Sequence, residues 1–236
     1  ITLQFNHDTE LLDWLRFGHK LSLNHDVKQS GDYNILNTMI ALPTQAIKNE
    51  DGTWAGPVGL AMYVGDVANP IGKMMENRSK TSGYNLLGNI YAEIKPLDCL
   101  TFKSTFGMQV MYWDTNKWTP KYDWAPIAQP ESEAFRSFDK SVTWLWDNTL
   151  TYMETFKEKH SLTAMIGESM QANTYEYMSG SIQGFISESA QQLSNGTLDP
   201  MLAGNKSDWS LLSFMARVSY GYDNRYLITA TCRADG

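Results

Sequence analysis

Apolar and polar residues alternate along most of the chain, and the stretch from Cys99 to Tyr112 shows the pattern best. One set of alternate positions, here called one parity, is mostly apolar and contains Leu100, Phe102, Phe106, Met108, Val110 and Tyr112. The other parity contains Thr101, Lys103, Thr105, Gly107 and Gln109. Successive side chains of a β-strand point to opposite faces. The stretch therefore predicts a long strand with one apolar face and one polar face.

The same period of two recurs along the rest of the chain and predicts further strands. These lie at Ile1–Asn6, Leu15–Val27, Lys80–Ile94, Ser141–Phe156, Ser161–Asn173, Ser210–Tyr222 and Arg225–Ala234. The total is about eight strands, several of them longer than the strand of about 5–6 residues that is usual in globular proteins. Most have the length of about 9–11 residues that a tilted strand needs to cross a bilayer.

Short and long connections alternate between the predicted strands. The short ones are Lys95–Asp98, Lys157–His160 and Tyr222–Asn224, and the long ones are about Lys28–Ser79, Trp113–Lys140 and Thr174–Trp209. Ile35, Leu36, Met39 and Ile40 have helical spacing before Pro43, which predicts a short helix in the first long connection. Short turns at one end and long loops at the other are typical of outer-membrane barrels. We therefore expect an all-β fold: an open, antiparallel up-and-down meander that forms part of a large transmembrane barrel.

Composition excludes some functional classes. The chain of 236 residues has a net charge of −7 and no Lys/Arg cluster, which argues against nucleic-acid binding. Its mean hydropathy of −0.37 is compatible with a barrel, whose lipid-facing and lumen-facing residues alternate. No apolar run reaches the length that a membrane helix needs.

Catalytic and metal motifs are not found in the sequence. No phosphate-binding loop, zinc spacing or nucleophile elbow is present, and Cys99 and Cys232 fit no metal or redox motif. The sequence thus predicts no enzyme, no cofactor and no metal site.

Two sets of residues are candidates for contacts with a transported molecule. Aromatic side chains in the predicted loops could stack on sugar rings, or they could pack against each other or against a partner protein. The aromatic candidates are Trp54, Tyr63, Trp118, Tyr122, Trp124 and Tyr175. Polar side chains of the second set are expected to line a wet lumen. They are Lys103, Gln109, Thr149, Thr151, Gln171, Arg217 and Arg233.

Several stretches resemble the SusC-like (SusC/RagA) TonB-dependent transporters of Bacteroidetes. They are Gly31–Gln45, Asn89–Ile94, Leu100–Gly107 and Thr163–Gly167. The most specific match is Ala216–Tyr220 followed by Arg225–Thr231 and Arg233–Gly236. The resemblance extends over nearly the whole chain. It implies a plugged outer-membrane barrel of about 22 strands that imports bulky nutrients, most often glycans or oligosaccharides and in some members peptides.

The resemblance also implies partners. A SusD-like surface lipoprotein would close over the barrel, the TonB complex would supply energy through a plug, and outer-membrane lipid would surround the wall. We expect residues 1–236 to be a single segment of the barrel, with the plug and the remaining strands outside this chain.

Two other folds are compatible with the same alternation. A soluble or surface β-domain that binds carbohydrate or protein would pack its apolar faces into a dry core. A small closed barrel of about eight strands would pair its first and last strands.

Overall fold

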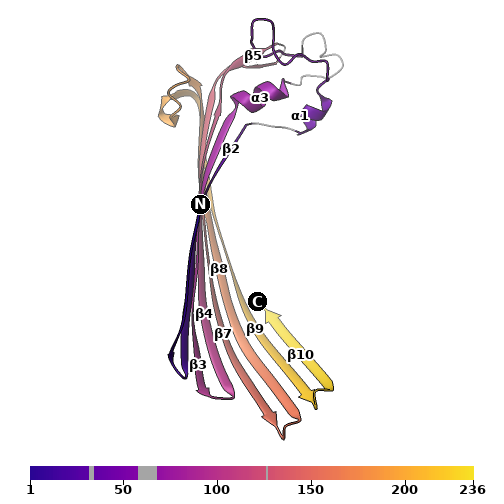
Figure 1. The fold of residues 1–236 in the computed structure, drawn as a ribbon. Coiled ribbons are helices and arrows are strands. Elements are labelled where there is room, and N and C mark those ends of the chain that lie inside the picture. Colours follow the sequence, from indigo (N-terminus) through magenta and orange to yellow (C-terminus); the bar gives the residue numbers. More distant parts are fainter. Residues whose placement is uncertain (32–34, 58–67, 126) are drawn as a thin grey trace.

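A single antiparallel sheet contains most of the chain (Figure 1). The computed structural model describes residues 1–31, 35–57, 68–125 and 127–236. Eight strands lie in the order β1-β2-β3-β4-β7-β8-β9-β10. Their order in the sheet is therefore the same as their order along the chain. The two edges are β1 and β10, which do not pair with each other. The predicted open meander is confirmed, and a small closed barrel is excluded.

Most strands are longer than the sequence pattern predicts. The strands are β1 (Thr2–Leu12), β2 (Leu15–Ser30), β3 (Arg78–Leu97), β4 (Leu100–Thr119), β7 (Glu133–Phe156), β8 (His160–Phe185), β9 (Gly196–Tyr222) and β10 (Tyr226–Asp235). The largest difference is that β8 continues beyond Asn173 and that β9 begins well before Ser210. Apolar–polar alternation fades in these parts, but the backbone pairing between the two strands continues, with a register shift between Ser181 and Gln183, as far as Phe185 and Gly196.

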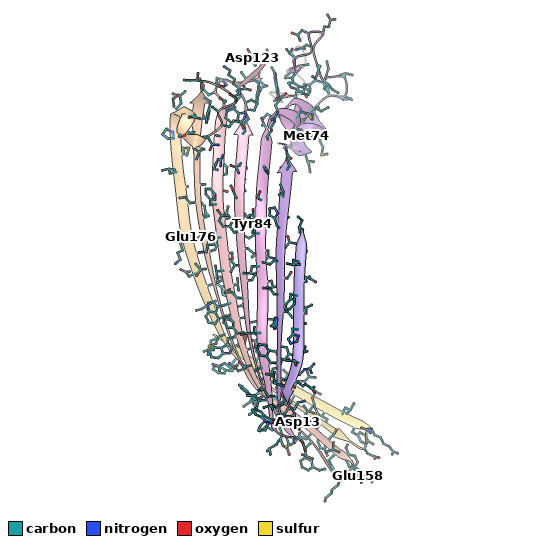
Figure 2. All side chains as sticks on the ribbon, turned by 60° about the vertical axis from the view of Figure 1, so that its left-hand side comes forward. Asp13, Met74, Tyr84, Asp123, Glu158 and Glu176 are labelled. Atoms are coloured by element: carbon teal, nitrogen blue, oxygen red, sulfur yellow. The ribbon has the colours of Figure 1, made fainter. Side chains whose placement is uncertain are left out.

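Short turns lie at one end of the sheet and long connections at the other (Figure 1). Lys157 and Glu158 in the β7–β8 turn have φ values of 50° and 55°, and Asp223 and Asn224 in the β9–β10 turn have 51° and 52°. Two consecutive residues with positive φ are typical of the type I′ turn, whose twist matches that of a β-hairpin. Figure 2 shows Asp13 and Glu158 at the short-turn end and Met74 and Asp123 at the long-connection end.

The long connections contain short elements of their own. They are α1 (Ile35–Ile40), α3 (Pro70–Glu76), the hairpin strands β5 (Tyr122–Trp124) and β6 (Ile127–Gln129), and the 3-10 helix η1 (Leu193–Asn195). The predicted helix corresponds to α1, whereas the β5–β6 hairpin was not predicted. Asn69 caps α3 by accepting hydrogen bonds from the backbone N–H groups of Ile71 and Gly72 at 3.1 and 3.0 Å. None of the helices in the described ranges has the length and apolar character required for a membrane span.

The large sheet is one layer thick, so side chains stand out from both of its faces (Figure 2). Phe102, Phe106 and Leu212 are 36%, 41% and 39% exposed, although a sandwich would bury them in a shared core. Trp118, Trp124 and Phe185 are buried, and all three lie near the long connections. The dry two-sheet core expected of a soluble β-domain is therefore not the arrangement in the described residues.

The strand register gives the sheet two chemically different faces, because directly paired residues of adjacent strands lie on the same side. Phe106 pairs with Trp146, Trp146 with Met170, and Met170 with Leu212. We call the side that these four residues share the apolar face. The opposite side, which carries Lys103 and Thr149, is called the polar face.

Candidate functional site on the polar face

All seven residues predicted to line a lumen lie on the polar face. Lys103 pairs with Thr149, and the same row continues through Gly167 and Met215 to Arg233. The remaining four residues have the same parity on their strands. They are Gln109 on β4, Thr151 on β7, Gln171 on β8 and Arg217 on β9. The structure thus brings these residues to one surface, and their lining of a lumen stays a prediction.

Near the short turns, the polar face carries charged groups that pair with each other. The Arg16 guanidinium donates two hydrogen bonds of 2.9 Å to the Asp8 carboxylate. Lys103 places its Nζ 4.6 Å from the centre of the Tyr91 ring. Farther from the turns, at the C-terminal end of β10, the Arg233 guanidinium donates to Asp235 Oδ1 at 2.7 Å. Bidentate and cation–π contacts of this kind hold long side chains flat against the sheet.

Nearer the long connections, the same face has a hydrogen-bonded network around Asp139. The Tyr175 hydroxyl donates to Asp139 Oδ1 at 2.6 Å, and the Ser137 hydroxyl donates to Asp139 Oδ2 at 3.1 Å. The Asn173 amide donates to Ser141 Oγ at 2.9 Å and to Thr143 Oγ1 at 2.8 Å. This network fixes neutral and acidic polar groups on adjacent strands.

Aromatic side chains surround this network on the polar face. Trp113 and Tyr177 both pair with Asp139, one from each neighbouring strand, and Trp209 pairs with Asn173. The Tyr175 and Tyr177 rings lie 6.2 Å apart. We call Trp113, Asp139, Asn173, Tyr175, Tyr177 and Trp209 the upper polar patch. Aromatic surfaces beside fixed polar groups can hold a ligand that has both apolar and hydroxyl or amide faces.

Three predicted loop aromatics gather in a separate cluster that joins the first long connection to the β5–β6 hairpin. The Tyr122 and Trp124 rings stack at 4.0 Å, and the Trp54 and Trp124 rings lie 6.4 Å apart. The Trp54 indole N–H donates to Glu76 Oε1 at 2.8 Å, and Lys48 Nζ lies 4.5 Å from the centre of the Trp54 ring. Only 6% of Trp124 is exposed, so its main contacts are with this cluster.

A tight turn supports the Trp54 side of this cluster. The Thr53 hydroxyl and backbone N–H donate to Asp51 Oδ1 at 2.6 and 2.9 Å. These two hydrogen bonds favour the charged carboxylate and lower the pKa of Asp51. Lys48 and Trp54 form an isolated antiparallel bridge across the turn.

Two of the predicted loop aromatics lie in strands of the large sheet. Trp118 lies in β4 and Tyr175 in β8, because these strands extend further than the alternation indicates. Trp118 is only 6% exposed, shares the parity of the apolar face, and makes an edge contact with Phe185 at 4.9 Å. Tyr175 belongs to the upper polar patch on the opposite face. Tyr63 lies outside the described residues, so the structure gives no position for this candidate.

Sequence reasoning missed the role of Asp139 and Trp209. Both were assigned to long loops, although both lie in strands. Continuing the strand parity of Thr143 back to Asp139, and that of Leu211 back to Trp209, would have placed both on the polar face. In the described ranges, no group of three or more His, Cys, Asp or Glu side chains is arranged to hold a metal ion.

The open meander, the two unlike faces and the segregation of short turns from long connections define a segment of β-barrel wall. No family model matches the chain. TonB-dependent receptor P26 of Formosa agariphila is 30% identical to it over 240 residues, covering 98% of this chain and 24% of that receptor. TonB-dependent receptor P3 of the same organism is 28% identical and covers 82% of this chain and 19% of that receptor.

Solved structures share the fold. A structure of the RagAB peptide transporter has a TM-score of 0.81 at 21% identity, covering 99% of this chain and 27% of that chain. The RagAB peptide importer in its open-open state also has a TM-score of 0.81. The chain is thus homologous to one segment of the TonB-dependent receptors, which confirms the predicted resemblance. It spans about a quarter of the length of the first of these relatives. The relatives are named as receptors and transporters, not as enzymes.

Proposed function

We propose that this chain forms part of the wall of a TonB-dependent transporter that imports bulky nutrients across the outer membrane. The observation that supports this most is the two-faced single-layer sheet, which has all its long connections at one end. A soluble protein would have to cover the exposed apolar face, whereas a barrel wall places such a face against lipid. The names of the similar receptors and transporters support the same function.

In this proposal the polar face lines the lumen and the apolar face contacts lipid. The long connections would lie outside the cell and the short turns in the periplasm, as in other barrels of this kind. The charged groups near the short turns, such as Asp8 and Arg16, would then face a plug that closes the barrel. The upper polar patch would face the part of the lumen that is open to the outside.

We propose oligosaccharides as the substrate class. The upper polar patch offers the rings of Trp113, Tyr175, Tyr177 and Trp209 beside neutral amide and hydroxyl groups. Its charged member, Asp139, is already hydrogen bonded to Tyr175 and Ser137. Stacking surfaces beside neutral hydrogen-bonding groups suit a sugar ring. Peptides are the competing class, since the solved RagAB structures are titled as a peptide transporter and importer.

A SusD-like lipoprotein is the partner that we propose for the external end. Helices α1 and α3 carry apolar side chains that are largely uncovered in this chain. Ile35, Met39 and Met75 are 69%, 78% and 58% exposed. Such side chains above the membrane would be covered by a protein surface. The TonB complex would act through a plug that is not part of this segment.

Binding measurements on the full-length receptor that contains this segment test the proposed substrate. Tyr177→Ala and Trp209→Ala should each weaken binding of a defined set of neutral oligosaccharides by roughly tenfold, equivalent to about 1.4 kcal/mol. Tyr112→Ala, on the apolar face, is the matched control and should leave the affinity unchanged. Calorimetric titration with oligopeptides of similar mass provides the comparison. Tight peptide binding that both patch variants weaken, with no oligosaccharide binding, would replace the substrate class.

A further inference from the structure

Basic side chains cluster on one part of the sheet, near the long connections. Lys80 pairs with Asn116 and Asn116 pairs with Arg136, so the three residues form one row across β3, β4 and β7. Arg78 lies two residues beyond Lys80 on the same side of β3. We call Arg78, Lys80, Asn116 and Arg136 the basic patch. Such a cluster stands out in a chain whose net charge is −7.

The basic patch belongs to the apolar face. Asn116 lies ten residues from Phe106 on β4, and Arg136 lies ten residues from Trp146 on β7. An even separation in a strand keeps two side chains on the same side. The patch is therefore a continuation of the face that we propose to contact lipid, toward the long connections.

An aromatic row separates the basic patch from the apolar part of this face. His25 pairs with Tyr84 and Tyr84 with Tyr112, and successive ring centres lie 4.5 and 6.5 Å apart. Figure 2 shows Tyr84 between the two ends of the sheet. Aromatic rows of this kind mark the membrane interface of a barrel. Lys80 lies four residues beyond Tyr84, about 13 Å along the strand, which is the level of lipid headgroups.

The positive charge of the patch is not neutralised within the described residues. None of the ion pairs there includes a residue of the basic patch. Arg136 donates one hydrogen bond of 3.3 Å, to the neutral Gln192 amide oxygen. Asp114 lies on the same side and accepts from the Asn116 amide at 3.1 Å. Three cations beside one carboxylate leave an excess of positive charge that an anion could neutralise.

A polar hollow of about 200 Å³ lies within the patch. Gln29, Lys80, Asn116, Arg136 and Gln191 are among the residues that line it. A phosphate group between Lys80 and Arg136 would receive charge-assisted hydrogen bonds from both. Asn116 Oδ1 is buried and has no hydrogen-bond donor in the described residues, so a neighbouring hydroxyl group could supply one. The row from Gln29 to Arg136 spans three strand spacings, about 14 Å, which is wider than one phosphate group.

Two apolar hollows continue from the aromatic row toward the short turns. The first has a volume of about 270 Å³ and is lined by Leu23, Tyr84 and Leu86, among others. The second has a volume of about 350 Å³ and is lined by Leu86, Gly88 and Phe106, among others. Because Leu86 lines both, the two hollows adjoin each other along β3. Their apolar walls suit acyl chains.

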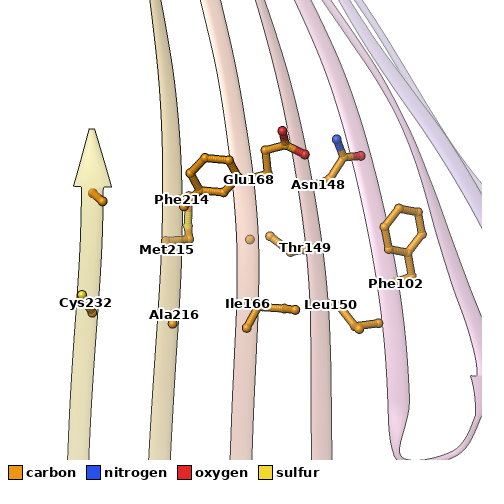
Figure 3. A pocket seen from close by; sticks show the side chains of 12 residues that line it. Phe102, Asn148, Thr149, Leu150, Ile166, Glu168, Phe214, Met215, Ala216 and Cys232 are labelled. Carbon is orange, nitrogen blue, oxygen red and sulfur yellow. The ribbon is translucent and has the colours of Figure 1, made fainter. Parts of the chain in front are cut away.

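Another hollow on the apolar face lacks the positive charge. It has a volume of about 520 Å³ and extends from Phe102 on β4 to Cys232 and Ala234 on β10 (Figure 3). None of the 12 residues that line it is Lys or Arg, and Figure 3 shows the Glu168 carboxyl at one end of it. This carboxylate would repel a phosphate group. Among the hollows described here, only those on β2, β3, β4 and β7 combine cations with apolar walls below them.

We propose that the basic patch and the two apolar hollows below it bind a phosphorylated glycolipid of the outer leaflet. The proposal rests on the membrane orientation given under Proposed function. The phosphate would contact Lys80 and Arg136, and sugar hydroxyl groups would contact the amides of Gln29 and Asn116. The acyl chains would follow the hollows along β3. Because β2 and β3 flank the first long connection, and β4 and β7 the second, the lipid would brace both where they leave the membrane.

Lipid binding to the full-length receptor that contains this segment tests the headgroup contacts. The receptor in detergent is titrated with lipid A that carries one phosphate, or with the same glycolipid without its phosphate, and native mass spectrometry counts the bound lipids. The phosphate should raise the apparent affinity roughly tenfold. Lys80→Gln and Arg136→Gln should each remove most of this preference. Lys206→Gln is the matched control, because Lys206 lies on the same face outside the hollow, 3.8 Å from Asp208, and should keep the preference.

Gly88→Leu tests the acyl contacts, because a leucine side chain would fill the hollow beside Leu21 and Phe106. It should weaken the binding of both glycolipids to a similar extent. Gly107→Leu, which adds the same side chain on the polar face of β4, is the control and should weaken neither.

Equal binding of the two glycolipids, or an equal loss of preference in Lys206→Gln, would overturn the site. If inorganic phosphate abolished the preference and Gly88→Leu had no effect, the patch would bind phosphate alone and the lipid would be rejected. A polarity-sensitive fluorophore on Val218→Cys, on the apolar face of β9, separates these failures from failure of the proposed function. A lipid-like signal without phosphate preference rejects only the lipid site, and a water-like signal rejects the membrane orientation itself.

Discussion

Replacing Trp118 by alanine should loosen the connection between β8 and β9 without affecting the upper polar patch. Trp118 packs against Ala134 and Phe185, and Ile182 and Leu193 cover the same cluster. The cluster therefore joins two paired strands to the turn that contains η1. Removing a buried aromatic ring typically costs about 3–5 kcal/mol, because the cavity that it leaves does not collapse fully.

That loss corresponds to a roughly 150-fold to 4,000-fold increase in local opening, since about 1.4 kcal/mol is a factor of ten. Hydrogen exchange of the detergent-solubilised full-length receptor, followed by mass spectrometry, measures this opening for residues 182–196. Trp113→Ala is the matched control. Trp113 lies five residues before Trp118 in the same strand but on the polar face, so its replacement should leave exchange in this segment unchanged.

Unchanged exchange after Trp118→Ala would show that the cluster does not hold the connection, and the packing argument would fail. A loss of substrate binding with unchanged exchange would instead assign Trp118 to the ligand, as the sequence first suggested. The two readouts therefore separate a structural role from a binding role.

Three further predictions follow from single contacts. Phe106→Lys should lower the free energy of unfolding of the receptor in liposomes by about 2–4 kcal/mol, measured by denaturant titration. Gln109→Lys, on the polar face, should change this free energy little. Equal effects of the two substitutions would contradict the two-faced wall. Asn69→Ala removes the cap of α3 and should destabilise that helix locally by about 1–2 kcal/mol, seen as faster proteolysis of the first long connection; an unchanged rate would contradict the capping role. Gly72→Ala would place a methyl group 2.8 Å from Trp124 Cη2. The cluster of Trp54, Tyr122 and Trp124 should therefore open, and the tryptophan fluorescence spectrum should shift. An unshifted spectrum would show that the cluster accommodates the methyl group.

The wall of the fold could be predicted from the sequence because lipid and water impose opposite demands on alternate residues. Leu100 to Tyr112 shows this alternation clearly, and the structure places that stretch within β4. The prediction ended too early in β8, where Tyr175 and Tyr177 alternate with Thr174 and Glu176, so that neither parity is apolar. In such parts, the strand is maintained by backbone hydrogen bonds to its neighbour. These bonds leave no alternation in the sequence, so the strand cannot be recognised from its side chains.

The candidate site could be predicted only in part for the same reason. Lys103 and Thr149 fall in alternating stretches, so their common face followed from parity. Asp139 and Trp209 lie in the strand extensions, and their proximity to Tyr175 depends on the register of three strands, β7, β8 and β9. The packing of Trp54 against Trp124 could not be foreseen either, because it joins two separate loops.

Pairing only between successive strands has a consequence for how such a wall can change. Each hairpin contributes one strip of lining and one strip of outer surface, and it depends on the next hairpin only through a backbone ladder. Gaining or losing a whole hairpin would alter the circumference of the pore and leave every other side chain on its own face. A single-residue insertion within β7 or β8 would instead turn the following side chains over, exchanging lining for outer surface along the rest of that strand. A gained or lost hairpin would therefore change the circumference by two strands, whereas the spacing of residues within a strand decides which face each side chain occupies.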